Sequence, residues 1–250
     1  MESGSSLHLT SQQLEEYTDK GYTIARRVFE DEDFEAFSQA FLRLVEERSG
    51  REFSTLHDLG LRDLFDQDPK LESDVYDANR GAAHLRQLAM DSRIAGLLGE
   101  LTLPERPFGV LEKLILRIDM PEWEREVAHW HQDYFFVKGN KETVTAWIPL
   151  QDVNNLNGCL KVEPGSHRLG AIDHDDKIGK RPVPSQQVVD SFEPEEVEMQ
   201  LGDVLLFHSL LFHSGQVNRS DAIRYSLQFR YSPLGLSTDP GMGELIELTK

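Results

Sequence analysis

The sequence predicts a mainly β fold, a barrel or two-sheet jelly roll, with helices in its N-terminal part. From residue 106 to 235, short β-rich segments alternate with turns containing Gly, Pro, Asn and Asp. Before residue 105, apolar residues recur at helical spacing. A length of 250 residues suits one sizeable core, and all-β folds of this size are often single domains. We therefore expect one domain over residues 1–250.

Helix signals dominate the N-terminal part. Thr10 and Ser11 offer N-cap hydroxyls to a helix that Gly21 ends, and "GYTIARRVF" after it has strand character. In "DEDFEAFSQAFLRLVEERSG" the aromatic residues fall at helical spacing, acidic residues come first and Gly50 comes last. Two more helices are expected near 82–90 and 91–101. The aromatic stripe is interpreted as core rather than as a cofactor surface.

The β-rich part contains six such segments and one long excursion. The segments are "VLEKLILRIDM", "TVTAWIPLQDV", "GCLKVEPGS", "EEVEMQLGDVLLFH", "LFHSGQV" and "AIRYSLQFRYSP". Between them, residues 168–196 are polar and contain several prolines and acids. Loops of this length are often lids or binding loops, and plain disorder is the alternative.

Charge and cysteine content restrict the partners. The net charge of −18 argues against nucleic acid or an anionic membrane, because both surfaces would repel the chain. Cys159 is the single cysteine, so no intrachain disulfide forms and a reducing cytoplasm is expected. No base stands beside Cys159 in the sequence, so a structural role is favoured. We expect a cytoplasmic monomer or homodimer whose partner is a small molecule.

The stretch "VAHWHQDYFF", residues 127–136, places two histidines and an aspartate in an apolar and aromatic run. On a strand, His131 and Asp133 would share one face and Gln132 the other. A third ligand would complete a metal site, and His208 and His213 are the two choices. Two histidines and one carboxylate leave open positions on iron, which suits a non-haem Fe(II) oxygenase.

Two further features qualify this motif. Oxygenases that use 2-oxoglutarate need a fixed cation for its far carboxylate, and Arg224 follows His213 by eleven residues, with Ser226 on its face. A His-x-Asp pair alone is a weak signal, because His174 to Asp176 repeats it among polar residues. We interpret that second copy as a solvated loop.

These motifs resemble the phytanoyl-CoA dioxygenase-like family of Fe(II)/2-oxoglutarate oxygenases over nearly the whole chain. The family pattern appears as His131/Asp133, "NGCLKVEPGSH" and "GDVLLFHSLLFHSGQVNRSDAIR". The resemblance implies a double-stranded β-helix, a cupin-like jelly roll, with the N-terminal helices packed outside it. It also implies Fe(II), 2-oxoglutarate and O2 as cofactor and cosubstrates.

Individual residues follow from the same resemblance. His131, Asp133 and His213 match the iron ligands, and only His213 lies at the family distance from the 2-oxoglutarate-anchoring Arg224. The other expected cosubstrate contacts match by position and are Trp147, Lys113, Thr145 and Ser226.

Substrate contacts are expected at Arg117, His129, Tyr134 and Phe135. Arg117 is in register with Lys113 and would supply a cation for an anionic substrate, with pairing to a strand charge as the alternative. His129 shares the face of His131 on a strand. Tyr134 and Phe135 would shape the pocket, and core packing is their default role.

The resemblance implies hydroxylation of a C–H bond, with release of succinate and CO2. The expected substrate is a small polar metabolite or a natural-product intermediate. The carboxylate of Asp133 argues against halogenation, whereas desaturation, epoxidation and ring formation stay open. Two alternatives are a jelly-roll metalloenzyme that does not use 2-oxoglutarate, and a non-catalytic binding module on the same fold.

Overall fold

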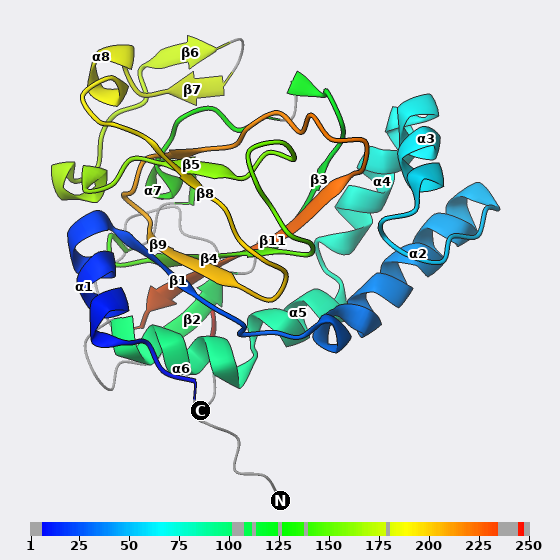
Figure 1. Cartoon of the computed structure of the whole chain (residues 1–250), viewed down its shortest axis with the longest axis horizontal. Helices are drawn as coiled ribbons and strands as arrows, with labels where there is room; N and C mark the ends of the chain where they lie inside the picture. The colour runs from blue at the N-terminus through cyan, green and yellow to red at the C-terminus, as the bar shows by residue number, and fades with distance from the viewer. Residues whose placement is uncertain are drawn as a thin grey trace, which may run out of the picture.

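A computed structural model of the chain describes residues 7–101, 108–111, 114–124, 127–137, 140–178, 181–234 and 245–247. Two antiparallel sheets form its centre, and a separate hairpin lies in the excursion (Figure 1). The main sheet has the order β1-β9-β4-β11-β2-β12, and β3 also pairs with β11. The second sheet has the order β10-β5-β8, and β6 pairs with β7. This arrangement confirms the predicted jelly roll.

Three strands, β6, β7 and β12, were not predicted, and the other strands overlap the predicted β segments. The strands of the main sheet are β1 (Tyr22–Ala25), β2 (Phe108–Leu111), β3 (Ile115–Asp119), β4 (Val144–Pro149), β9 (Val204–His208), β11 (Arg224–Pro233) and β12 (Leu245–Glu247). The other strands are β5 (Leu160–Val162), β6 (Asp176–Ile178), β7 (Arg181–Val183), β8 (Glu195–Val197) and β10 (His213–Ser214).

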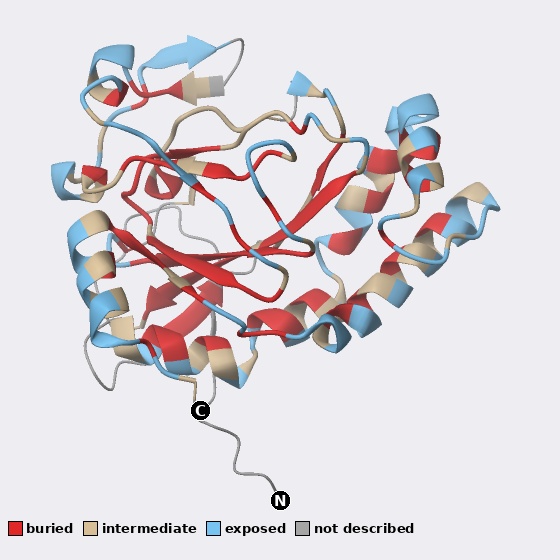
Figure 2. Ribbon diagram, in the orientation of Figure 1, coloured by how far each residue is buried: buried red, intermediate tan, exposed pale blue. Residues whose placement is uncertain are grey.

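Helices cover the outer face of the main sheet, with buried inner sides and exposed outer sides (Figure 2). They are α1 (Ser11–Lys20), η1 (Asp31–Phe34), α2 (Glu35–Ser49), α3 (Leu59–Gln67), α4 (Pro69–Asn79), α5 (Ala83–Ala89) and α6 (Ser92–Leu101). Helices α1, α2, α5 and α6 were predicted. No helix within the described ranges is both long and apolar enough to span a bilayer.

Helices α3 and α4 were missed, although their N-terminal signals are present. The side chain of Asp58 accepts a hydrogen bond from the backbone N–H of Gly60, which caps α3. Asp68 caps α4 in the same way, and Pro69 occupies its first turn.

The two faces of β11 have different tasks. Tyr225, Leu227, Phe229 and Tyr231 are buried in the core between the sheet and the helices, where the Tyr225 ring meets Phe41 edge-on at 5.6 Å. The alternate residues of β11 lie on the opposite face, toward the second sheet, because side chains alternate along a strand. That face supplies the polar residues of the site.

The N-terminal part joins the same sheet as the β-rich part. Residues 22–25 of β1 pair with residues 204–207 of β9. The turn before β9 contains Gly202 at φ +86°, where a Cβ would lie only 2.0 Å from the carbonyl oxygen of Phe29. This close approach holds the segment after β1 against the turn before β9, where the N–H groups of Val28 and Phe29 donate to the carbonyl oxygen of Gly202.

The excursion at 168–196 has regular structure in its described parts. It contains the end of η3 (Ser166–Leu169), the β6–β7 hairpin, α8 (Gln186–Val189) and the start of β8. The hairpin and α8 lie together beyond the second sheet (Figure 1). The alternative of plain disorder is therefore wrong for these elements.

Glu163, directly after β5, is a buried carboxyl whose Oε2 has no hydrogen-bond partner among the described residues. Burial, together with the negative charge of Asp190, raises the pKa of Glu163 to about 7. The folded state therefore holds this proton more tightly than the unfolded chain. Its contribution to stability is full below the ordinary pKa of 4.5 and is lost as the pH rises through about 7.

Glu163→Gln should remove this pH dependence. We expect the variant to gain ~2 kcal/mol in free energy of unfolding at about pH 8, and almost nothing at about pH 4. Urea denaturation at the two pH values measures both. Exposed Glu193→Gln is the matched control, and an equal gain at both pH values would contradict the role of the buried carboxyl.

Candidate active site

Three side chains that are far apart in the sequence meet between the two sheets. The backbones of His131 and His213 form an isolated β-bridge, in which the N–H of each residue donates to the carbonyl oxygen of the other at an N···O distance of 3.0 Å. Oδ1 of Asp133 lies 3.8 Å from Nε2 of His131 and 4.0 Å from Nε2 of His213. Among the described residues, these form the one cluster with metal-ligating potential, all three ligand atoms within 4.8 Å of one another.

Hydrogen bonds fix the tautomer of both histidines. Nδ1 of His131 donates to the carbonyl oxygen of His129 at 2.7 Å, and Nδ1 of His213 donates to that of Leu211 at 3.1 Å. Each Nε2 is then left with a lone pair that faces Asp133. Burial is the main cause that lowers the pKa of His131 to about 3 and the pKa of His213 below its ordinary value. Both rings are therefore neutral, as a metal ligand requires.

Asp133 is held by a buried ion pair with Arg230, which sequence analysis missed. Nε of Arg230 donates to Oδ2 of Asp133 at 3.0 Å, and Nη2 donates to Oδ1 at 2.8 Å. Burial alone would raise the pKa of Asp133, but the charge of Arg230 and its hydrogen bonds hold the pKa below its usual range. The carboxylate is therefore ionised and oriented toward the histidines.

A strand-register signal could have identified Arg230. It lies on the same face of β11 as Arg224 and Ser226, at the even positions of a period-two pattern. Its partner across the sheet is Thr145 on β4, whose hydroxyl also donates to Oδ2 of Asp133 at 2.6 Å. In this structure the Thr145 hydroxyl thus binds the carboxylate of Asp133, and its predicted contact with the cosubstrate stays a prediction.

The backbone around the motif differs from the expected strand. Asp133 begins the short helix α7 (Asp133–Val137), so the period-two rule ends at this residue. The side chain of Gln132 is fully buried. Its Nε2 donates to the carbonyl oxygens of Gly170 and Leu210, and its Oε1 accepts from the N–H of Ile172. Gln132 therefore ties the 168–196 excursion to the ligand segment.

His174 is buried, which contradicts its interpretation as part of a solvated loop. Its Nε2 accepts a hydrogen bond from the N–H of Gln132 at 3.2 Å, and its ring stacks on Phe135 at 4.1 Å. The sequence around His174 is polar and gave no sign of burial, because its aromatic partner Phe135 belongs to the distant segment next to Asp133. His208, the competitor of His213, instead uses Nδ1 to accept from the N–H of Leu210 at 3.1 Å.

A second polar group on the same face centres on Arg224. Its Nη2 lies 2.8 Å from Oδ2 of Asp119, and its guanidinium carbon lies 5.7 Å from the Trp147 ring. Arg117 donates to Oδ1 of Asp119 at 2.6 Å, which is the strand-charge pairing that sequence analysis kept as an alternative. Among the described residues of this group, two arginines and one aspartate leave an excess of one positive charge.

Several buried polar atoms in this group have no hydrogen-bond partner among the described residues. They are Nε and Nη1 of Arg224, Nε1 of Trp147 and Oγ of Ser226. Unsatisfied buried donors are costly, and one carboxylate would accept from several of them while neutralising the excess charge. The donors therefore fit the far carboxylate of 2-oxoglutarate. Lys113, another expected contact, lies outside the described residues.

The expected substrate contacts fall in different surroundings. His129 lines two cavities beside the histidine cluster, at the junction between them. Tyr134 is buried, and its N–H donates to the carbonyl oxygen of Ser209. Phe136, the next aromatic residue of the same run, is half-exposed, lines one cavity and meets the His131 ring edge-on at a centroid distance of 5.4 Å.

A jelly roll that carries two neutral imidazoles and a carboxylate beside a buried arginine has the features of a non-haem Fe(II)/2-oxoglutarate oxygenase. The model of the phytanoyl-CoA dioxygenase (PhyH) family matches residues 17–226. The chain belongs to this family.

Individual relatives are similar to this chain over only part of their own length and part of its length. A probable phytanoyl-CoA dioxygenase of Caenorhabditis elegans is 30% identical over 109 residues, which span 41% of this chain and 35% of the relative. A 1-deoxypentalenic acid 11-beta-hydroxylase of Streptomyces arenae is 33% identical over 113 residues, spanning 41% and 40%. Less than half of each relative is therefore matched.

Among solved structures, the chain resembles the epimerase SnoN in complex with Fe3+, alpha ketoglutarate and nogalamycin RO. The TM-score is 0.65 at 21% identity, over 95% of this chain and 98% of that one. This similarity shows a common fold over nearly the full length of both chains.

Proposed function

We propose that the protein is a non-haem Fe(II)- and 2-oxoglutarate-dependent dioxygenase that hydroxylates a C–H bond of a small molecule. The observation that carries the proposal is that two sites lie against one face of β11, which contributes Arg224 to one and, through its contact with Asp133, Arg230 to the other. The His131, Asp133 and His213 cluster fits a metal ion, and the unsatisfied donors around Arg224 fit a carboxylate. A metalloenzyme without 2-oxoglutarate would have no use for the second site.

Each residue has a distinct task in this proposal. His131, Asp133 and His213 hold Fe(II), which when bound supplies dioxygen activation coupled to decarboxylation of 2-oxoglutarate to succinate and CO2. Arg224 and Ser226 bind the far carboxylate of 2-oxoglutarate, and Trp147 packs beside it. Thr145 and Arg230 orient Asp133. Phe136 and Phe207, which contact the rings of His131 and His213, limit the access of water to both.

Hydroxylation is the favoured outcome because a carboxylate ligand is present and the Streptomyces relative is named as a hydroxylase. That relative also supports a natural-product intermediate as substrate. The structural neighbours include a carbocyclase, SnoK, and the epimerase SnoN, so the same fold accommodates other outcomes. Because β1 belongs to the main sheet, we further propose one domain over the whole chain, and we propose a cytoplasmic location.

Arg224→Gln tests the cosubstrate site. We expect the Kd of 2-oxoglutarate to rise about 100-fold, because a charged, buried, bidentate partner is lost. Calorimetric titration of the Fe(II)-loaded protein under nitrogen measures this change, and the Fe(II) affinity itself should be unchanged.

Arg62→Gln on the surface of α3 is the matched control and should bind 2-oxoglutarate as the parent does. If Arg224→Gln binds 2-oxoglutarate as tightly as the parent, Arg224 is not its anchor. If the parent does not bind 2-oxoglutarate and Arg224→Gln keeps the turnover of the parent, the alternative of a metalloenzyme without 2-oxoglutarate takes the place of this proposal.

A further inference from the structure

Two adjoining cavities lie beside the cluster of His131, Asp133 and His213, which is called the metal cluster below. The smaller, of about 240 Å³, contacts His131 and Phe136. The larger, of about 380 Å³, shares Ala128, His129 and Val183 with it. The larger cavity is lined by Trp130 and Ser214, which are the chain neighbours of the ligands His131 and His213. The two ligand segments therefore continue from the metal cluster into the wall of the larger cavity.

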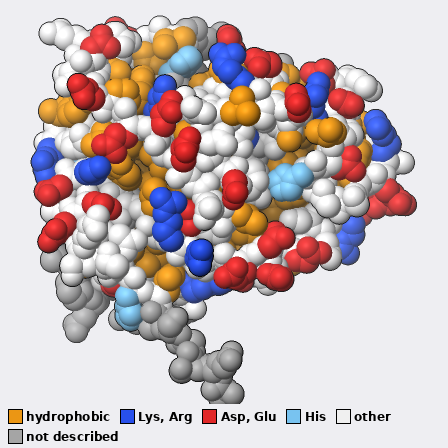
Figure 3. All heavy atoms as spheres, in the orientation of Figure 1, with side chains coloured by type: hydrophobic (Ala, Val, Ile, Leu, Met, Phe, Trp, Pro, Cys, Tyr) orange, Lys and Arg blue, Asp and Glu red, His pale blue; other side chains and the backbone are white. Residues whose placement is uncertain are grey.

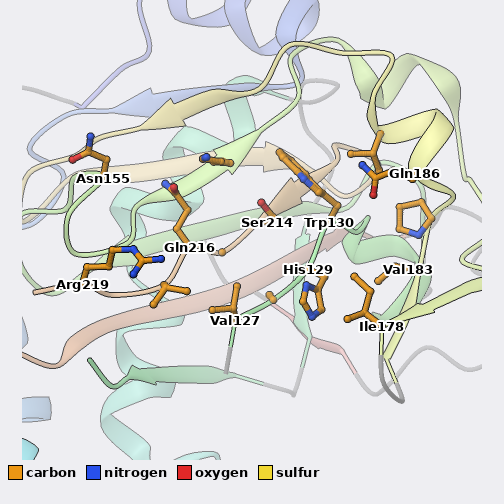
Figure 4. A pocket seen from close by; sticks show the side chains of 16 residues that line it. Val127, His129, Trp130, Asn155, Ile178, Val183, Gln186, Ser214, Gln216 and Arg219 are labelled. Carbon is orange, nitrogen blue, oxygen red and sulfur yellow. The ribbon is translucent and has the colours of Figure 1, made fainter. Parts of the chain in front are cut away.

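The two ends of the larger cavity differ in polarity. Figure 4 shows His129, Val183 and Ile178 at one end, and Arg219 with Asn155 at the other. His129 and Val183 also line the smaller cavity, so their end is the one nearer His131. The excursion contributes much of the apolar wall there. Its lining residues are Ile178, Val183, Pro184 and Val189.

The charge of the lining is opposite to that of the protein. The chain has 44 acidic and 26 basic residues, and acidic side chains are spread over the face drawn in Figure 3. No Asp or Glu occurs among the described residues that line the larger cavity, whereas Lys161 and Arg219 both do. A cation would gain nothing from this lining, and an anion would meet two positive side chains.

Both cations can change partner at small cost. Arg219 pairs with Glu122 at 3.4 Å, and Lys161 pairs with Glu196 at 3.4 Å. All four side chains are one-third exposed or more, and ion pairs of this kind contribute little stability. A ligand anion inside the cavity can therefore replace the surface glutamates.

We propose that the two cavities bind the primary substrate as an elongated, largely apolar small molecule with one anionic group, a carboxylate or phosphate, at its far end. Arg219 holds the anionic group, and Lys161 adds a second positive charge to the lining. Trp130 and the apolar residues of the excursion enclose the body, which extends past His129 toward the metal cluster. The inference rests on the proposed function for the identity of the reacting end. It goes beyond that function by assigning the substrate class and the two specificity-determining cations.

The test compares probes of equal chain length and different charge. Decanoate, decyl phosphate, decanol and decylamine are titrated into the Fe(II)- and 2-oxoglutarate-loaded protein under nitrogen, and into the metal-free protein. Trp130 in the cavity wall provides a fluorescence readout, and loss of the signal in Trp130→Phe assigns it to this site. We expect at least one of the two anions to bind about tenfold more tightly than decanol, and decylamine to bind most weakly.

Matched variants locate the charge preference. Arg219→Gln combined with Lys161→Gln should weaken anion binding about tenfold and leave decanol binding unchanged. Arg168→Gln combined with Lys20→Gln is the control, because Arg168 and Lys20 also form exposed pairs with acids, Asp19 and Glu195, but do not line the cavity. Equal affinity for all four probes, no binding of any probe, or an equal loss in the control would overturn the proposal.

The outcome is separable from that of the proposed function. If the protein prefers anions but never forms succinate, the anion subsite is supported and the proposed oxygenase function is overturned. If it forms succinate but does not prefer anions, the oxygenase function is supported and the anion subsite is overturned.

Discussion

Asp133→Asn is expected to weaken Fe(II) binding by more than about 100-fold and to abolish turnover. Asp133 supplies the one anionic ligand atom of the cluster, and its Oδ1 lies within 4.0 Å of both histidine Nε2 atoms. Even residues that only orient a metal ligand typically contribute 10- to 100-fold in affinity, so loss of the ligand itself costs more. Anaerobic calorimetry with Fe(II) measures the affinity.

The choice of asparagine matters for this experiment. Either substitution removes the counter-charge of the buried Arg230, a loss that typically costs 3–5 kcal/mol, but alanine also removes both oxygens that accept hydrogen bonds from Arg230. Asparagine keeps the shape and an acceptor for Thr145. Thermal melting shows whether the variant is folded.

His208→Asn is the matched control for the cluster, since His208 is the competing histidine in the sequence. We expect it to keep its Fe(II) affinity, because its Nδ1 already accepts the N–H of Leu210 and it is not part of the cluster. Loss of iron from His208→Asn, with iron retained in Asp133→Asn, would show that the ligand set is wrong.

Arg230→Met is expected to lower both stability and metal affinity. The variant leaves the Asp133 carboxylate buried with the Thr145 hydroxyl but without its bidentate partner. Breaking a buried ion pair on one side typically costs 3–5 kcal/mol in unfolding free energy. Loss of the group that orients a ligating carboxylate should reduce Fe(II) affinity by about 10- to 100-fold.

Arg230→Lys separates charge from geometry. Lysine keeps the positive charge but cannot form the two parallel hydrogen bonds, so stability should recover more than metal affinity does. Urea denaturation and anaerobic Fe(II) titration of the same samples give the two quantities.

The variants of the two β11 arginines, Arg224 and Arg230, also serve as experimental controls for each other. Arg224→Gln should change the affinity for 2-oxoglutarate and leave iron binding intact, whereas the Arg230 variants should change iron binding first. If Arg230→Met binds Fe(II) as tightly as the parent, the ion pair with Asp133 is not what orients the ligand.

The sequence by itself determined the architecture and the principal members of the site. Alternation along "AIRYSLQFRYSP" separates a core face from a polar face, and it needs only the period of a strand. The spacing from His213 to Arg224 is likewise a property of one local segment. Capped helices such as α3 were also available from local signals and were missed because their apolar periodicity is short.

Only the tertiary structure decided which side chains meet. Arg230 and Asp133 are 97 residues apart, and their contact depends on the register that sets Arg230 opposite Thr145. Asp119 reaches Arg224 through a second register, between β3 and β11. Gln132 and His174 became buried because α7 interrupts the strand and the excursion folds onto it. These contacts come from long-range packing, and local sequence patterns do not encode which distant strand or loop packs against which.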